Sequence, residues 1–189
     1  MVEQSTIAAT PGPALGLDLA GQESDGRAQF LQVRISPQLR AALPVESLTE
    51  VLAVPFGQIV PIPHMPDWVM GAYNWRGDIL WVADLGHLLG MTPWHQLRQT
   101  SGRHAVAVLH GDKANRKSRG SFAQILGVAV AQVDEIATYD ATEIQSPPDG
   151  TVSAGLAPFL RGYWVAPEEE MVAVLDARSL LARAAQSSG

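Results

Sequence analysis

Residues 60–89 read VPIPHMPDWVMGAYNWRGDILWVADLGHLL, and this stretch decides the fold. Two short runs rich in aliphatic and aromatic residues, 72–75 and 79–82, lie on either side of Arg76 and Gly77. Glycine at the second position of a tight turn accepts a positive φ. The pair therefore predicts a β-hairpin whose two strands are these runs.

Large aromatic residues are concentrated in the same stretch. Alternation along a strand places Tyr73 and Trp75 on one face and Asn74 on the other. Together with Trp68 and Trp81 they are too many broad rings for a small barrel to bury completely. We therefore expect some of them in the core and one or two at a surface, where aromatic side chains are favoured binding anchors.

A helix signal follows the second run. Asp84 precedes the segment 85–89, and Gly90 comes directly after it, so a carboxylate can cap a short helix and a glycine can end it. Asp176 stands before residues 177–182 in the same way. We interpret both aspartates as helix caps rather than as catalytic acids.

Three short blocks occur twice in the same order along the chain. The first and second copies lie at 45–51 and 130–136, at 68–73 and 159–164, and at 82–89 and 174–181. The copies are separated by 85, 91 and 92 positions, which is far above the period of about 20–50 residues typical of solenoids. The duplication predicts two similar subdomains.

The segments between the blocks are short, rich in valine and separated by glycine and proline, a pattern typical of many short strands. The strand-like runs include 30–35, 72–75, 79–82, 105–109, 125–130 and 171–175. The polar stretch 96–102 separates a first subdomain at about 28–95 from a second at about 103–182. Residues 1–26 and 183–189 are interpreted as tails around one domain, 27–182.

Composition excludes several classes of protein. The chain has 189 residues, of which 47% are hydrophobic and 17% charged, and no run approaches the ~18 apolar residues that a membrane span needs. Cysteine is absent, which excludes disulfides, thiolate metal sites and cysteine nucleophiles. No lysine or arginine precedes Arg27, so a secretory signal is not expected, and we expect a cytoplasmic protein.

The chain contains no motif that carries recognisable chemistry. It has no phosphate-binding loop, dinucleotide fingerprint or nucleophile elbow. The five histidines lack the spacing of metal ligands, so we expect no metal, no cofactor and no enzymatic activity. One alternative left open is a hydrolase that uses His64, His104 and an aspartate.

The stretch 112–119, DKANRKSR, is the longest charged segment. It is interpreted as a solvated hairpin tip, although residues 113–119 contain four cations that could also bind nucleic acid as part of an acidic β-barrel module. Two observations oppose that alternative. No aromatic residue lies among the cations to stack on bases, and the net charge of -6 repels phosphate backbones.

Residues 60–89 resemble the core signature of the CheW-like chemotaxis coupling proteins. The matching features are a proline-rich approach, an aliphatic residue two before Gly71, an N-x-R-G hairpin and a V-x-D-L end. Further segments fall where the family has comparable ones, so the resemblance covers about residues 28–182. It implies an all-β fold of two SH3-like five-stranded β-barrels packed together, with short capped helices.

The resemblance also implies a function. Family members are non-enzymatic adaptors that join chemoreceptor tips to a CheA-type histidine kinase in chemotaxis, pilus-based movement or phototaxis. The groove between the barrels is the expected receptor site, and the barrel ends are the expected kinase contacts. Arg76 and Glu50 match positions implicated in partner binding, and Leu48, Asn74 and Trp75 lie beside them.

Other roles for two of these residues remain open. Arg76 could be a hairpin residue that favours solubility, and Glu50 could pair with a nearby cation. Departures from the family pattern at Trp75, Trp81 and Ala131 affect the choice of receptor and kinase rather than the fold.

Overall fold

The computed structural model describes residues 27–96, 102–111, 125–147, 150–165 and 170–186. The predicted N-terminal tail, 1–26, lies outside the described residues. So does the basic stretch 112–119, on which the nucleic-acid alternative depends.

Ten β-strands and two α-helices make up most of the described chain. The strands are β1 (Arg27–Ser36), β2 (Leu39–Pro44), β3 (Leu48–Pro55), β4 (Val69–Trp75), β5 (Asp78–Asp84), β6 (Arg103–His110), β7 (Ile125–Val130), β8 (Gln132–Asp140), β9 (Leu160–Val165) and β10 (Met171–Leu175). The helices are α1 (Leu85–Leu88) and α2 (Ala177–Ala185). Short 3-10 helices are Val45–Ser47, Phe56–Gln58, Trp94–Gln96, Ala141–Glu143 and Ala157–Phe159.

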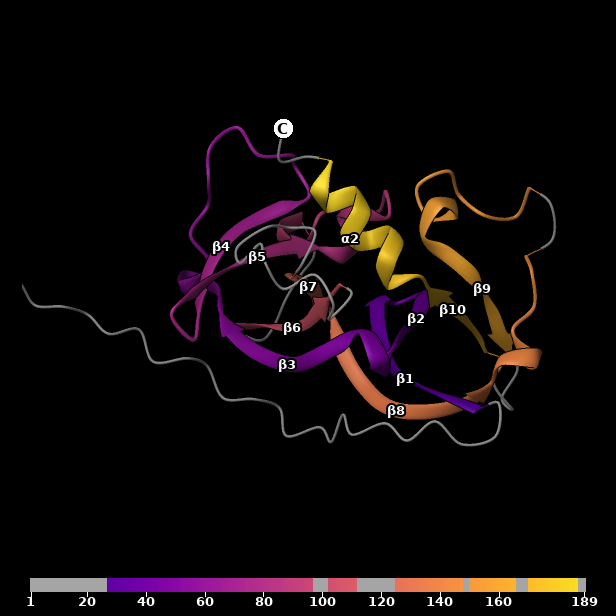
Figure 1. The fold of residues 1–189 in the computed structure, drawn as a ribbon. Helices are drawn as coiled ribbons and strands as arrows, with labels where there is room; N and C mark the ends of the chain where they lie inside the picture. The colour runs from indigo at the N-terminus through magenta and orange to yellow at the C-terminus, as the bar shows by residue number, and fades with distance from the viewer. Residues whose placement is uncertain (1–26, 97–101, 112–124, 148–149, 166–169, 187–189) are drawn as a thin grey trace, which may run out of the picture.

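The strands form two five-stranded sheets that lie side by side (Figure 1). The first sheet has the order β3-β6-β7-β5-β4, and the second has the order β8-β1-β2-β10-β9. Neighbouring strands are antiparallel except for β5 beside β7 and β10 beside β2, which are parallel. The predicted all-β fold of two five-stranded units with short capped helices is confirmed.

The two sheets are built on one plan. Reading the two sheet orders together pairs β3 with β8, β6 with β1, β7 with β2, β5 with β10 and β4 with β9. An isolated bridge joins Val60 to Ala72 beside the first sheet, and another joins Gln145 to Tyr163 beside the second. These two bridges are related by the same offsets, 85 and 91, that relate the sequence blocks. The duplication in the sequence is therefore a duplication of structure.

Each sheet combines strands from both halves of the chain. The first sheet takes β6 and β7 from the second half, and the second sheet takes β1 and β2 from the first half. The two sheets therefore do not correspond to the predicted subdomain ranges 28–95 and 103–182. The reason is that each repeat begins with two strands that pair in the sheet of the other repeat.

Three hydrophobic clusters hold the molecule together. One small cluster consists mainly of residues of the first sheet, which curls into the first barrel, and another consists of residues of the second sheet, which forms the second barrel. The largest cluster combines residues of both sheets and lies between them. Along β6, Val106 and Val108 belong to the cluster of the first barrel, whereas Ala107 and Leu109 belong to the cluster between the sheets. Burial of both faces explains why the central strands are almost continuously apolar.

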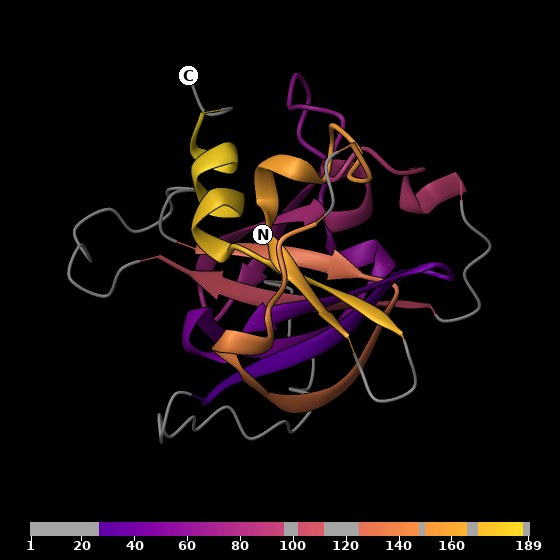
Figure 2. The ribbon, with the colours of Figure 1, turned by 90° about the vertical axis from the view of Figure 1, so that its right-hand side faces the viewer.

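In Figure 1, α2 lies across the place where the two sheets adjoin, and Figure 2 shows the same helix, in yellow, at one edge of the molecule. α1 follows β5 of the first sheet and contacts β1 of the second, while α2 follows β10 of the second sheet and contacts β6 and β7 of the first. The predicted caps are confirmed, because Asp84 accepts a hydrogen bond from the backbone N–H of His87 and Asp176 accepts one from that of Arg178. In the described part of the chain, neither helix has the length and apolar character needed to cross a bilayer.

α2 is longer than its sequence pattern predicts. The helix extends to Ala185, and the side chain of Ala184 is fully buried in the cluster between the sheets. Residues 183–185, expected in the C-terminal tail, therefore belong to the helix. The reason is packing against the junction, which continues the apolar face of the helix past the expected end at residue 182.

Candidate partner-binding site

The β4–β5 hairpin ends in a tight turn at Arg76 and Gly77, as predicted. Trp75 pairs with Asp78, and the two turn residues have φ values of 55° and 87°. Both values are positive, which is the geometry of a two-residue turn that matches the twist of the strands. The side chain of Asn74 accepts a hydrogen bond of 3.1 Å from the backbone N–H of Gly77. The turn therefore presents Arg76 in a defined place although arginine rarely adopts a positive φ.

Glu50 of β3 joins this turn to the opposite edge of the first sheet. Its Oε1 accepts a hydrogen bond of 2.7 Å from Nε1 of Trp75. Nη2 of Arg76 lies 2.9 Å from Oε1 and 3.0 Å from Oε2 of the same carboxylate. Because β3 and β4 are the two edge strands of the first sheet, these contacts show that the sheet is curled until its edges meet.

Burial is unequal within this cluster, which we call the hairpin cluster: Glu50, Asn74, Trp75 and Arg76. The side chain of Glu50 is 13% exposed, whereas that of Arg76 is 65% exposed. The guanidinium carbon of Arg76 also lies 5.5 Å from the centre of the Trp75 ring. A largely buried carboxylate thus holds a solvent-accessible guanidinium over an indole ring. The contacts to Glu50 use Nη2, so N–H donors at Nε and Nη1 are not used by them.

The structure brings together four of the five residues that the sequence singled out. The fifth, Leu48, lies on β3 close to Glu50 but is only 6% exposed and packs in the cluster between the sheets. A register shift separates the two residues in the pairing of β3 with β6. The alternative that Glu50 pairs with a cation describes part of its role, since the cation is Arg76 itself.

A second group of titratable and aromatic side chains lies where the two sheets adjoin. His104 is 3% exposed, and its ring centre lies 4.2 Å from that of Phe56 and 4.4 Å from that of Trp94. Burial lowers the pKa of His104 to about 4, although the nearby carboxylate of Asp84 acts in the opposite direction. The neutral imidazole is therefore the stable form at neutral pH.

The hydrolase alternative depends on His64 and His104 with an aspartate. His104 lies buried near Asp84, whereas His64 is exposed in the segment between β3 and β4. Across the described residues, no three histidine, aspartate or glutamate side chains are grouped as metal ligands would be. The sequence contains no local signal for the group around His104, because Phe56, Trp94 and His104 are far apart along the chain.

Exposed apolar residues mark equivalent hairpins in the two barrels. Ile79 on β5 is 60% exposed and Met171 on β10 is 54% exposed, and the offset of 92 relates the two positions. Val165, which pairs with Met171, is 43% exposed. The sequence carries no sign that these residues are exposed, because their exposure follows from their place at the hairpin ends.

Comparison with known proteins gives one consistent result. The family model described as a CheW-like domain matches residues 29–185. Over 120 residues the chain is 32% identical to the chemotaxis protein CheW of Rhizobium meliloti (strain 1021), covering 64% of this chain and 67% of that protein. It is 29% identical over 120 residues to the probable chemotaxis protein CheW of Rhizobium etli (strain ATCC 51251), covering 63% and 66%.

A solved structure supports the fold. The scaffolding protein TtCheW from Thermoanaerobacter tengcongensis superposes with a TM-score of 0.62, at 21% sequence identity, and the match covers 81% of this chain and 91% of that one.

Proposed function

The chain belongs to the CheW-like family, and on that premise we propose that it is a cytoplasmic, non-enzymatic adaptor that couples chemoreceptors to a CheA-type histidine kinase. The signalling would control chemotaxis, pilus-based movement or phototaxis. An adaptor of this kind acts by holding two partners together, which raises their effective concentration and transmits a conformational bias between them. The names of the relatives support this function and give no support to nucleic-acid binding.

The hairpin cluster is the observation that carries the proposal at the level of residues. Arginine is among the residue types most enriched in side chains that dominate binding energy, whereas Trp75 is only 9% exposed and supports Arg76 from within the fold. Here an exposed Arg76 lies over Trp75 and is held by Glu50, so its position is set before a partner arrives. Pre-organisation of this kind reduces the entropy lost on binding.

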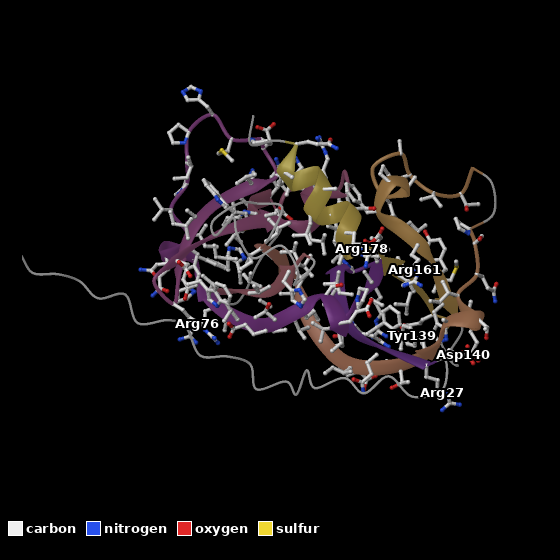
Figure 3. All side chains as sticks on the ribbon, in the orientation of Figure 1. Arg27, Arg76, Tyr139, Asp140, Arg161 and Arg178 are labelled. Atoms are coloured by element: carbon white, nitrogen blue, oxygen red, sulfur yellow. The ribbon has the colours of Figure 1, made fainter. Side chains whose placement is uncertain are left out.

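The receptor contact is tested by reversing the charge of Arg76. We expect Arg76→Glu to weaken binding of the receptor tip by roughly tenfold or more, since the exposed guanidinium offered to the partner is replaced by a carboxylate of opposite charge, which Glu50 also repels. Arg178→Glu is the matched control, because Arg178 is also an exposed arginine but lies on α2, away from Arg76 (Figure 3). The circular dichroism of both variants should keep the β spectrum of the parent.

Two outcomes would count against this part of the proposal. Equal losses of receptor binding in both variants would show a general effect of net charge rather than a site. Loss of the folded β spectrum in Arg76→Glu alone would make Arg76 a structural residue of the hairpin.

The kinase contact is proposed for the exposed apolar hairpin ends. Ile79 and Met171 are more than half exposed at equivalent places in the two barrels. We expect co-elution of the chain with the regulatory domain of its own CheA-type kinase at tens of micromolar. Ile79→Glu and Met171→Glu should each reduce this binding while receptor binding persists. Absence of any complex between the parent chain and that domain would contradict the proposed coupling role.

A further inference from the structure

Three turns meet around a pocket at the junction of the two sheets. They are the β1–β2 turn, the segment after α1 and the turn from β7 to β8. The pocket has a volume of about 150 Å³. Gln38, Thr92 and Ala131 line it and are exposed residues, so it opens to solvent. It lies apart from the hairpin cluster, and none of its lining residues belongs to that cluster.

The pocket has apolar walls and three buried polar side chains, of which Ser36 is 8% exposed and lies at the rim turn. Ile35, Met91 and Trp94 supply the apolar surface. Asp84 is 6% exposed and His104 is 3% exposed, and both line the pocket. An apolar pocket with a few convergent polar groups is the usual form of a small-molecule site.

Size restricts what the pocket can hold. A cavity of about 150 Å³ lined by apolar side chains is known to accommodate benzene. The pocket here has this volume, so it suits a single six-membered ring rather than a larger molecule. The ring of Trp94 and the sulfur of Met91 offer a favourable surface to an aromatic guest.

Charge restricts the ligand further. The carboxylate of Asp84 accepts one backbone hydrogen bond at each oxygen, 3.2 Å from His87 and 2.7 Å from Trp94. Each carboxylate oxygen can accept a second bond, so the pocket offers acceptors. The residues that line it include no lysine and no arginine, so an anion would face Asp84 without a neutralising cation. His104 faces the same space as a neutral ring with one donor and one acceptor.

We propose that this pocket binds a small neutral aromatic molecule that carries one O–H or N–H donor, with a ring the size of phenol. The donor bonds to Asp84 or His104, and the ring lies among Ile35, Met91 and Trp94. The inference is independent of the proposed coupling function. The bound ring would contact turns of both sheets and so would stabilise their junction.

The test is a titration of the ¹⁵N-labelled full chain with phenol, benzene and benzoate, followed by two-dimensional NMR. We expect phenol to shift the backbone amides of Thr92, Trp94 and Ala131 with a Kd of about 1 mM or weaker, as befits seven non-hydrogen atoms. Benzene should bind several-fold more weakly because it has no donor. Benzoate should bind at least about tenfold more weakly than phenol, because its charge repels that of Asp84.

Two variants locate the site. Ala131→Phe places a ring at the rim and should abolish the phenol-induced shifts, whereas Ala141→Phe makes the same change at an exposed position outside the pocket and should leave them intact. Gln38→Lys adds a cation at the rim and should bring benzoate binding to within about twofold of phenol binding.

Three results would overturn the proposal. The first is the absence of phenol-induced shifts at these amides up to 20 mM, a concentration of about twenty times the expected Kd. The second is equal binding of benzoate and phenol by the parent chain. The third is displacement of a receptor or kinase fragment by phenol at the pocket, which would make a partner's tyrosine side chain the occupant rather than a free molecule.

Discussion

At the scale of single residues, Glu50 is the largely buried member of its ion pair and Arg76 the exposed one, which is the residue we propose for partner binding. Replacing Glu50 with alanine removes the acceptor for Trp75 Nε1, and a hydrogen bond to a charged group of this kind contributes about 1.5–3 kcal/mol. We expect Glu50→Ala to lower the free energy of unfolding by about 2 kcal/mol. Glu50→Gln, which keeps an acceptor, should cost about half as much. Urea unfolding measures both.

The ion pair itself is expected to contribute little. Because the side chain of Arg76 is 65% exposed, solvent screens its attraction to Glu50. A double-mutant cycle with Glu50→Ala and Arg76→Ala should give a coupling below about 1 kcal/mol. A coupling of several kcal/mol would show that the pair mainly holds the edge strands β3 and β4 of the first sheet together, and would contradict a role of Arg76 in partner binding.

His104 makes stability depend on pH. Its pKa is about 4 in the folded protein because of burial, and about 6.5 when unfolded. Between these pH values the unfolded chain binds the proton more strongly than the folded chain does. The contribution of His104 to the free energy of unfolding is therefore complete above pH 6.5 and is lost as the pH falls towards 4. The loss is at most about 3 kcal/mol. We expect this slope in urea unfolding at pH 7.5, 5.5 and 4.5, and a flatter one in His104→Gln; parallel slopes would contradict it.

The residues of the hairpin cluster differ in how far sequence could predict them. Asn74, Trp75 and Arg76 are adjacent, so the turn chemistry at Gly77 was sufficient to place them together. Glu50 is 25 residues from Trp75, and the contact between them exists only because the first sheet curls until β3 meets β4. Burial of Leu48 likewise depends on the second sheet, which no local pattern describes.

At the scale of elements, the β4–β5 hairpin depends on a glycine for close approach. Gly71 has a φ of 145°, and a Cβ there would lie 2.2 Å from the backbone oxygen of Val60. We expect Gly71→Ala to destabilise the fold by at least about 2 kcal/mol, since the contact is with backbone and cannot yield easily. Gly77→Ala meets no neighbour and should cost only the strain of its φ of 87°, about 1 kcal/mol.

Gly57→Ala is the control for both substitutions. A Cβ at Gly57 would meet nothing within 4 Å, and its φ lies outside the positive region. Its thermal midpoint should be close to that of the parent. If Gly71→Ala unfolds at the same temperature as Gly57→Ala, the bridge between Val60 and Ala72 does not constrain the hairpin.

The two helix caps should differ in strength. Asp84 is 6% exposed and accepts from two backbone N–H groups on separate segments. Asp176 is half-buried and accepts from the backbone of Arg178 and the hydroxyl of Ser179. We expect Asp84→Ala to cost about 2 kcal/mol, because two part-buried backbone donors lose their partner. Asp176→Ala should cost about 1 kcal/mol, the usual value of a cap. Equal losses in urea unfolding would contradict this ranking.

Strand prediction succeeded where β-branched or aromatic residues are frequent, and it failed for β2, which has neither. The runs at 125–130 and 171–175 coincide with β7 and β10. β2, with the sequence LRAALP, was not expected as a strand because alanine and leucine carry no β signal. It is nonetheless a central strand between β1 and β10, where small side chains fit between two packed layers.

At the scale of the whole molecule, the duplication predicted two like units but not how the chain divides between them. Equivalent blocks fall on β3 and β8, on β4 and β9, and on β5 and β10. The first copies, on β3, β4 and β5, all lie in the first sheet, and the second copies all lie in the second sheet. The strands that pair in the sheet of the other repeat are β1, β2, β6 and β7, and they lie outside the blocks except for Val130, the last residue of β7. Which sheet a strand joins depends on pairing between distant residues, and a one-dimensional pattern does not record it.

This interleaving predicts that the molecule unfolds as one unit. Each sheet needs strands from both halves, and the largest hydrophobic cluster lies between the sheets. We expect calorimetry of the full chain to show a single two-state transition. Fragments 1–101 and 102–189 should be unfolded when alone, because each lacks two central strands of one sheet, and should recover the β spectrum when mixed in equal amounts. A cooperative thermal transition in either isolated fragment would contradict this prediction. It would show that a barrel can fold without the two strands that the other half of the chain supplies.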